Sequence, residues 1–181
     1  MRVAIYGGSF NPPHVVHGMV AAWLLWTGQV EQVWLVPVYR HAFESWHGKA
    51  LAPFEARVRW CEALARDVDP RVQVSTIEAE LPVPSYTIST LRALAARHPE
   101  HRFRLVVGAD VLQQSPKWRA WDEIAAEFAP IAVGRAGYPS PPGGVVFPEL
   151  SSTEIRARLA AGEPIDGLVT RGVLPLLQET A

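Results

Sequence analysis

A short apolar segment at residues 2–6 (RVAIY) runs directly into GGSFNPPHVVH, residues 7–17, and this junction most constrains the fold. Gly7 and Gly8 allow the backbone to approach a ligand closely and to adopt conformations that other residues avoid. A helix that begins near His14 would direct free N–H groups at an anion. A strand, a glycine turn and a helix N-terminus in this order indicate a phosphate-binding loop. Its spacing matches neither the G-x-G-x-x-G dinucleotide fingerprint nor the Walker A loop.

The rest of the chain alternates short apolar segments with helical patterns. The apolar segments predict strands at residues 2–6, 33–37, 72–77, 103–107 and 130–134, and a short extended piece near 145–147. Helical patterns cover residues 19–26, 54–66, 85–98, 118–128, 152–160 and 169–179. A strand, a helix and a strand within the first forty residues have the size of a right-handed parallel unit. We therefore predict an α/β fold, a Rossmann-like open sheet of about five parallel strands with helices on both faces.

Composition predicts one globular domain over residues 1–181. Hydrophobic residues make up 49% of the chain and charged residues 19%, which is enough apolar content for one substantial core. The formal net charge of −1 gives no general attraction to nucleic acid or to an anionic membrane, so we expect neither as a partner. We find no secretory signal and no run of roughly 18 apolar residues, so we expect a cytoplasmic protein. Cys61 is the only cysteine and is expected to be a packing residue.

A second candidate anion site lies at LSSTEIR, residues 150–156. Ser151 and Glu154 have the spacing of a capping box, which is one interpretation of this segment as an ordinary helix N-terminus. The other interpretation is a phosphate site. In that case hydroxyl and N–H groups lie at the positive end of a helix dipole, and the guanidinium of Arg156, one turn further on, fits phosphate oxygens.

The first motif resembles that of the nucleotidyltransferase superfamily with paired active-site histidines, in particular the nicotinate/nicotinamide mononucleotide adenylyltransferases. The family pattern reads approximately Gly-Gly-Thr/Ser-Phe-Asp-Pro-x-His-x-Gly-His, and His14 and His17 fall on its two histidines. Asn11 stands where the family has Asp, and Val16 where it has Gly. Two histidines three residues apart could also pack against a sheet without a chemical role, but the glycines and prolines before them favour the ligand-binding interpretation.

Further segments match the family in the same order along the chain. Residues 150–156 match the Ser-Ser/Thr-x-x-Arg motif that holds the triphosphate of ATP. Tyr86 and Thr87 fall in a segment that faces the pyridine mononucleotide, where Ser89 replaces a frequent Asp. Residues 108–110 (GAD) followed by Trp118 resemble a pattern in which the Asp meets a ribose or ring substituent and the Trp stacks on the pyridine.

The tryptophan match and a further arginine each keep a second interpretation. Trp118 and Trp121 could both be core or interface residues on one helix, although we favour Trp118 as ligand-facing and Trp121 as core. Arg135 resembles the arginine that follows the family's fifth strand and approaches the nucleotide phosphates, but it could also be a solvated loop charge.

The basic segment at residues 38–53 resembles a family loop only in composition and place. It holds Arg40, His41, His47 and Lys49, of which Lys49 is the predicted phosphate contact. No spacing among the motif and loop histidines resembles a structural zinc pattern, so we expect no protein-held metal. The resemblance implies a Mg²⁺ ion that enters with the ATP phosphates.

The resemblance implies adenylyl transfer from ATP to nicotinate mononucleotide, which gives nicotinate adenine dinucleotide and pyrophosphate in NAD biosynthesis. The alternatives are another acceptor, such as nicotinamide mononucleotide or phosphopantetheine, or an inactive nucleotide-binding module; a homo-oligomer stays an open option. The predicted catalytic residues are His14, His17 and Arg156. The predicted ATP-binding residues are Gly7, Gly8, Ser9, Phe10, His14, His17, Lys49, Gly108, Asp110, Arg135, Ser151, Ser152, Thr153 and Arg156. The predicted acceptor-binding residues are Tyr86, Thr87, Asp110 and Trp118.

Overall fold

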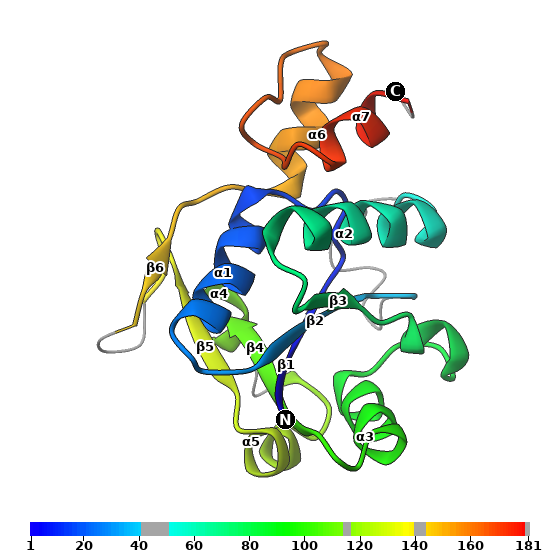
Figure 1. Ribbon diagram of the computed structural model, residues 1–181, viewed down its shortest axis with the longest axis vertical. Helices are drawn as coiled ribbons and strands as arrows, with labels where there is room; N and C mark the ends of the chain where they lie inside the picture. Colours follow the sequence, from blue (N-terminus) through cyan, green and yellow to red (C-terminus); the bar gives the residue numbers. More distant parts are fainter. Residues whose placement is uncertain (41–50, 114–116, 140–143, 180–181) are drawn as a thin grey trace.

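The computed structural model describes residues 1–40, 51–113, 117–139 and 144–179, and its centre is a parallel sheet of six strands (Figure 1). The strand order is β3-β2-β1-β4-β5-β6, and every neighbouring pair is parallel. The strands are β1 (Arg2–Gly8), β2 (Gln32–Pro37), β3 (Val72–Val74), β4 (Arg102–Gly108), β5 (Ile131–Arg135) and β6 (Val146–Phe147). The predicted α/β fold is confirmed, with six strands in place of about five because the extended piece near 145–147 pairs with β5.

Helices cover both faces of this sheet. They are α1 (Val15–Trp26), α2 (Phe54–Val68), α3 (Thr87–Arg97), α4 (Ala109–Leu112), α5 (Trp121–Phe128), α6 (Ser152–Ala160) and α7 (Val173–Gln178). Side chains alternate between the faces along each strand. In β1, Ala4 joins the core cluster under α1, α2, α6 and α7, whereas Val3 and Ile5 join the cluster under α3 and α5. This alternation explains why the strands read as continuous apolar runs.

Two predicted elements differ from the structure at their ends. The strand predicted at 72–77 stops at Val74, and a 3-10 turn (Ile77–Glu80) follows it. The helix predicted at 118–128 begins only at Trp121, because Ala120 adopts a left-handed conformation with φ of 57° that the first helical turn cannot include. Trp118 therefore lies before the helix, and the two tryptophans do not share one helical face.

The C-terminal segment packs against the first two helices. The Gly172 N–H donates to Asp67 Oδ2 at 2.7 Å, and a Cβ at Gly172 would lie 2.9 Å from the same carboxylate oxygen. The Val15 N–H donates to the Leu168 carbonyl at 3.0 Å. These contacts bring α6 and α7 to the N-terminal end of α1, where the sequence predicted a ligand site.

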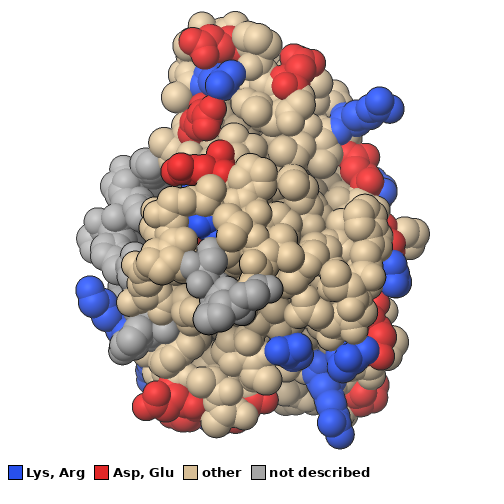
Figure 2. Space-filling model, turned by 90° about the vertical axis from the view of Figure 1, so that its left-hand side faces the viewer, with Lys and Arg blue, Asp and Glu red and all other residues tan. Residues whose placement is uncertain are grey.

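Figure 2 shows the face on the side of β6. Across its middle this face carries few charged side chains, and the largest group of basic ones lies at the lower right of the view. Of the helices that the structure describes, none has the length and apolar composition needed to cross a membrane.

Candidate active site

The phosphate-binding loop predicted at the end of β1 packs around the ring of Phe10. This ring is 2% exposed, and its residue adopts a left-handed φ of 45°, which is uncommon for a side chain of this size. A Cβ at Gly8 would lie 3.3 Å from the ring, so any larger residue there would press against it. The ring also makes edge contacts with Tyr6 and His17, at centroid distances of 5.8 and 4.9 Å. We call residues 7–14 the cradle.

The two motif histidines lie on each other at the start of α1. Their rings stack with a centroid distance of 3.8 Å. His14 is the N-cap residue, and its backbone N–H donates to Nδ1 of His17 at 3.0 Å. Because Nδ1 of His17 accepts this bond, the proton of the neutral ring must lie on Nε2. The spacing of three residues thus places the second imidazole under the helix N-terminus and fixes its tautomer.

Both imidazoles are held in their neutral form. The pKa of His14 is lowered to about 4, first by burial and then by the positive charge of Arg135. The pKa of His17 lies well below its usual value, first through burial and then through His14 and Arg135. Each ring near pH 7 therefore offers one N–H donor and carries no charge.

The N-terminus of α6 binds directly to the cradle, although about 140 residues separate them in sequence. Ser152 Oγ donates to the Pro12 carbonyl at 2.8 Å, and Arg156 Nη1 donates to the Asn11 carbonyl at 2.5 Å. Arg156 Nη2 also donates to Thr153 Oγ1 at 3.3 Å. The structure thus brings the two predicted anion motifs into one place.

The capping interpretation of residues 150–156 also holds in the structure. Ser151 Oγ accepts a hydrogen bond from the Glu154 N–H at 3.2 Å, which is the N-cap contact that the spacing predicted. The two interpretations of this segment are compatible, because Ser151 caps the helix while the next residues contact the cradle.

Asp110 and Arg135 form an ion pair at the carboxyl ends of β4 and β5. Arg135 Nη1 lies 2.6 Å from Asp110 Oδ2, and its guanidinium lies 5.7 Å from the centre of the Tyr138 ring. A Cβ at Gly108 would lie 2.5 Å from Asp110 Oδ1, so a side chain there would displace this carboxylate. Arg135 is thus a partly exposed, ion-paired residue at the end of β5, and its contact with nucleotide phosphates stays a prediction. Its charge lies close enough to lower the pKa of both histidines.

Of the four predicted acceptor residues, Asp110 lies in this ion pair, whereas Tyr86, Thr87 and Trp118 lie with α3 and α5 on the other face of the sheet. Tyr86 is the N-cap residue of α3, Thr87 is the first residue of that helix, and the Arg119 guanidinium lies 4.7 Å above the Tyr86 ring. Trp118 contacts Trp121 edge to face at 5.9 Å, and both are only partly buried. Among the described residues, no hydrogen bond or ring contact joins this group to the two histidines.

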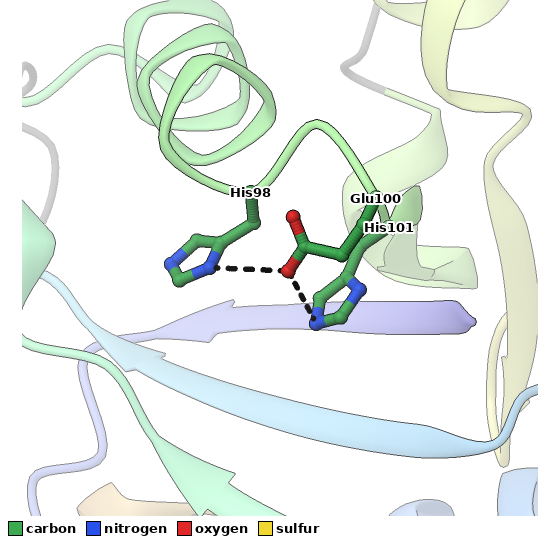
Figure 3. A group of neighbouring side chains, drawn as sticks. All are labelled: His98, Glu100 and His101. Carbon is green, nitrogen blue, oxygen red and sulfur yellow. Dashed lines mark ion pairs between the residues drawn. The ribbon is translucent and has the colours of Figure 1, made fainter.

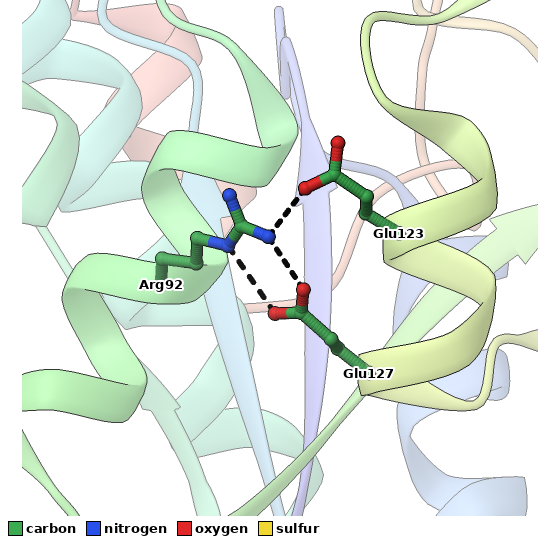
Figure 4. Close-up of polar contacts among 3 residues, drawn as sticks. All are labelled: Arg92, Glu123 and Glu127. Carbon is green, nitrogen blue, oxygen red and sulfur yellow. Dashed lines mark hydrogen bonds and ion pairs between the residues drawn. The ribbon is translucent and has the colours of Figure 1, made fainter.

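An ion-pair network holds the two elements of this acceptor group together. Arg92 of α3 lies between Glu123 and Glu127 of α5 and contacts both (Figure 4). Its Nε donates to Glu127 Oε2 at 3.2 Å. The network joins α3, which follows Tyr86, to α5, which begins three residues after Trp118.

The predicted phosphate contact Lys49 lies outside the described residues, as do His41 and His47. The described parts of that segment are held in place at both ends. At its start, the Ser85 N–H donates to the Arg40 carbonyl at 2.9 Å. At its end, the Ala52 N–H donates to Asn11 Oδ1 at 3.0 Å. The side-chain amide of Asn11, which stands where the family has Asp, therefore helps to hold the end of this segment.

Sequence reasoning missed two residues beside the cradle. Tyr6 was assigned only to the first strand, but its ring contacts Phe10 and His17, and burial followed by the charge of Asp110 raises its pKa. Arg57 is 1% exposed and donates to a carbonyl of the cradle. The helical period contained a signal for Arg57, because it lies four and seven residues before the buried Cys61 and Leu64.

A group of possible metal ligands lies in the turn between α3 and β4, and the sequence analysis did not consider it. His98 Nδ1 and His101 Nε2 lie 3.8 and 3.4 Å from the same oxygen of Glu100 (Figure 3). This shared carboxylate accounts for the convergence of the two rings. Nδ1 of His101 is buried without a hydrogen-bond partner among the described residues, whereas histidines that bind metals normally donate through their second nitrogen. The turn adjoins the amino end of β4, and the cradle follows the carboxyl end of β1.

Comparison with known proteins identifies the family. A family model described as cytidylyltransferase-like matches residues 5–158. A probable nicotinate-nucleotide adenylyltransferase of Anaeromyxobacter sp. (strain K) is 51% identical over 181 residues, which cover 98% of this chain and 94% of the relative. This chain belongs to the nicotinate-nucleotide adenylyltransferase family. A probable nicotinate-nucleotide adenylyltransferase of Myxococcus xanthus (strain DK1622) is 39% identical over 180 residues, covering 99% of this chain and 93% of the relative.

Solved structures of adenylyltransferases share the fold. The nicotinic acid mononucleotide adenylyltransferase of Plasmodium falciparum, solved with NaAD, matches with a TM-score of 0.81 at 17% identity, over 99% of this chain and 95% of that one. A putative nicotinate-nucleotide adenylyltransferase of Vibrio parahaemolyticus matches with a TM-score of 0.75 at 23% identity, over 98% of this chain and 92% of that one. The resemblance inferred from the motifs is confirmed, and family membership makes the chain a nucleotidyltransferase.

Proposed function

We propose that this protein transfers the adenylyl group of ATP to nicotinate mononucleotide, giving nicotinate adenine dinucleotide and pyrophosphate. The names of its relatives in Anaeromyxobacter and Myxococcus support this substrate, and so does the NaAD bound by the Plasmodium protein. The structural observation that carries the proposal is the contact of Ser152 and Arg156 with the cradle, next to the two neutral histidines. This arrangement gathers hydrogen-bond donors where a triphosphate would need them.

The reaction is an in-line displacement at the α-phosphorus of ATP. An oxygen of the acceptor phosphate forms the new P–O bond, and the bond between the α-phosphorus and the bridging oxygen breaks, so that pyrophosphate leaves with the electron pair. The attacking phosphate is already anionic, so no general base is required. Catalysis then depends on alignment and on stabilising charge in the transition state.

Neutral imidazoles suit this role. Nε2–H of His17 is the free donor, because Nδ1 is already occupied by the His14 backbone. Nδ1 of His14 is enclosed without a partner among the described residues, so this ring too would meet a ligand through Nε2. We assign both Nε2 atoms to oxygens of the α- and β-phosphates, and Arg156 with Ser152 and Thr153 to the β- and γ-phosphates.

ATP would enter as its Mg²⁺ complex. Mg²⁺ keeps most of its waters and binds phosphate oxygens in preference to dedicated protein cages. The carboxylate of Asp110 is paired with Arg135 through Oδ2, so its charge is already partly balanced within the protein. In our proposal the metal is part of the substrate, and the protein holds none of its own.

A panel of acceptors tests the function directly. The purified protein is incubated with Mg-ATP and, in separate reactions, with nicotinate mononucleotide, nicotinamide mononucleotide or phosphopantetheine. We expect pyrophosphate release and a product with the mass of nicotinate adenine dinucleotide, fastest with the first acceptor. Faster turnover of another acceptor would contradict the substrate assignment. ATP binding without pyrophosphate release in any reaction would indicate an inactive nucleotide-binding module.

A further inference from the structure

Arg57 is a positive charge at a core position of α2. Its side chain is 1% exposed, on the helix face of the fully buried Cys61 and Leu64. Burial lowers its pKa, and among the described residues no carboxylate forms an ion pair with it. The charges of Glu78 and Glu55 act on it only from a distance. Enclosing a guanidinium without a directly paired carboxylate is unfavourable unless its donors are well used. The position therefore calls for a specific explanation.

Two N–H groups of the Arg57 guanidinium donate to backbone carbonyls. Nη1 donates to the Ser9 carbonyl at 2.9 Å, and Nε donates to the Ala52 carbonyl at 3.0 Å. The Ala52 N–H in turn donates to Asn11 Oδ1, and the guanidinium lies 5.5 Å from the centre of the Phe54 ring. Arg57 thus connects both sides of the cradle turn, Ser9 and Asn11, to the segment that leads into α2.

The bond to Ser9 fixes the direction of the next peptide group. In a planar trans peptide the carbonyl and the following N–H point in opposite directions. With the Ser9 carbonyl turned toward Arg57, the Phe10 N–H is turned away from it. Phe10 also has the left-handed φ of 45°, a conformation that persists only where the surroundings enforce it. Asn11, the next residue, presents its carbonyl to Arg156.

We propose that Arg57 is a positioning residue for nucleotide phosphates, acting through the cradle backbone and touching no substrate itself. It holds the Ser9–Phe10 peptide and the Ala52–Asn11 contact in the geometry that lets the cradle and Arg156 receive ATP. This inference rests on the proposed function only in taking a nucleotide triphosphate as the ligand.

The test compares Arg57→Met and Arg57→Lys with Arg59→Met, a control on the exposed side of the same helix. Methionine fills a similar apolar volume but has no donor, and lysine keeps the charge but cannot bond both carbonyls in the planar geometry of a guanidinium. Assays are run well below each thermal midpoint, so that the fraction folded does not differ between variants. We expect Arg57→Met to lower kcat/KM for Mg-ATP by about 10–100-fold, since small misplacements have effects of this size.

The split between substrates distinguishes positioning from a general loss of structure. KM for the acceptor should stay within about twofold of wild type, because α3 and α5 hold that group independently of α2. Arg57→Lys should lie between Arg57→Met and wild type, and Arg59→Met should match wild type. Equal kcat/KM for Mg-ATP in Arg57→Met and wild type would overturn the proposal, and so would parallel losses for both substrates.

Two further measurements cover other outcomes. If Arg57→Met does not fold, Arg57→Lys and Asn11→Ala are the deciding variants, because Asn11→Ala removes the acceptor for the Ala52 N–H. Both variants should weaken the use of Mg-ATP, and wild-type behaviour of both would overturn the proposal. If the wild-type protein fails to turn over any acceptor, Mg-ATP binding is measured by calorimetry. Weaker binding in Arg57→Lys than in Arg59→Met then supports the positioning role although the proposed function has failed, and equal binding contradicts it.

Discussion

His14 and His17 begin a helix with no acidic residue in its first turn, and both rings are enclosed enough to stay neutral near pH 7. A protonated imidazole would attract a phosphate more strongly in the ground state. A neutral donor fixed in one tautomer instead needs no counter-ion and no proton exchange before each turnover. At the scale of single residues, the site thus depends on burial and on one backbone hydrogen bond.

The depressed pKa of His14 predicts how stability changes with pH. The folded value of about 4 lies below the ordinary value of 6.5, so between these pH values the unfolded chain binds more protons. The free energy of unfolding should therefore fall as the pH is lowered from 7 toward 4, by up to about 3 kcal/mol from this residue. Urea unfolding at several pH values measures the slope. His14→Gln should show a shallower slope, and an unchanged slope in that variant would contradict the assignment.

Asn11→Asp tests how far the departure from the family pattern matters. The Oδ1 atom accepts from the Ala52 N–H, and a carboxylate oxygen can accept the same bond. We expect this variant to keep kcat/KM for Mg-ATP within about threefold of wild type or to exceed it. Steady-state assays at saturating acceptor measure this. A sharp loss of activity would mean that the cradle of this chain is adapted to a different substrate.

Two helix ends meet at the cradle, and their junction is the main feature at the scale of elements. α1 contributes its N-terminus and both histidines, and α6 contributes Ser152 and Arg156 from the far end of the chain. Because these contacts are side chain to backbone, they depend on the path of the loop as well as on residue identity. The same is true of Arg57, which donates to the Ser9 carbonyl of the cradle.

Arg156→Lys should disturb this junction while keeping the charge. Lysine cannot reproduce the two directed bonds of the guanidinium to the Asn11 carbonyl and Thr153 Oγ1. We expect kcat/KM for Mg-ATP to fall by about 10–100-fold. Arg158→Lys is the matched control, because Arg158 lies on the same helix in an exposed pair with Glu154. Equal activity of the two variants would show that Arg156 has no role in ATP use.

At the scale of the whole molecule, the alternation of apolar segments predicted the fold class and most strands and helices. For the sixth strand, local patterns predicted only an extended piece near 145–147, because two residues at Val146–Phe147 are too few to show a strand period. Nor could they predict the left-handed Ala120 that delays α5, since alanine is a good helix former.

Motif spacing found the two halves of the candidate site, but not what lies between them. The contact of α6 with the cradle crosses about 140 residues, and the roles of Tyr6 and Arg57 depend on tertiary contacts with the cradle and His17. Such contacts leave only weak signals in a sequence. For Arg57 the signal was a charged residue on the apolar face of a helix.

The central claim is that a neutral imidazole donor on α1 stabilises the transition state of adenylyl transfer. The most direct test is kcat of His17→Ala with Mg-ATP and nicotinate mononucleotide both saturating, with His98→Ala as a control at the other end of the sheet. We predict that kcat of His17→Ala falls by about 10²–10³-fold, as for the loss of one transition-state donor, while His98→Ala keeps the wild-type rate. A kcat of His17→Ala close to that of the wild-type protein would contradict the account.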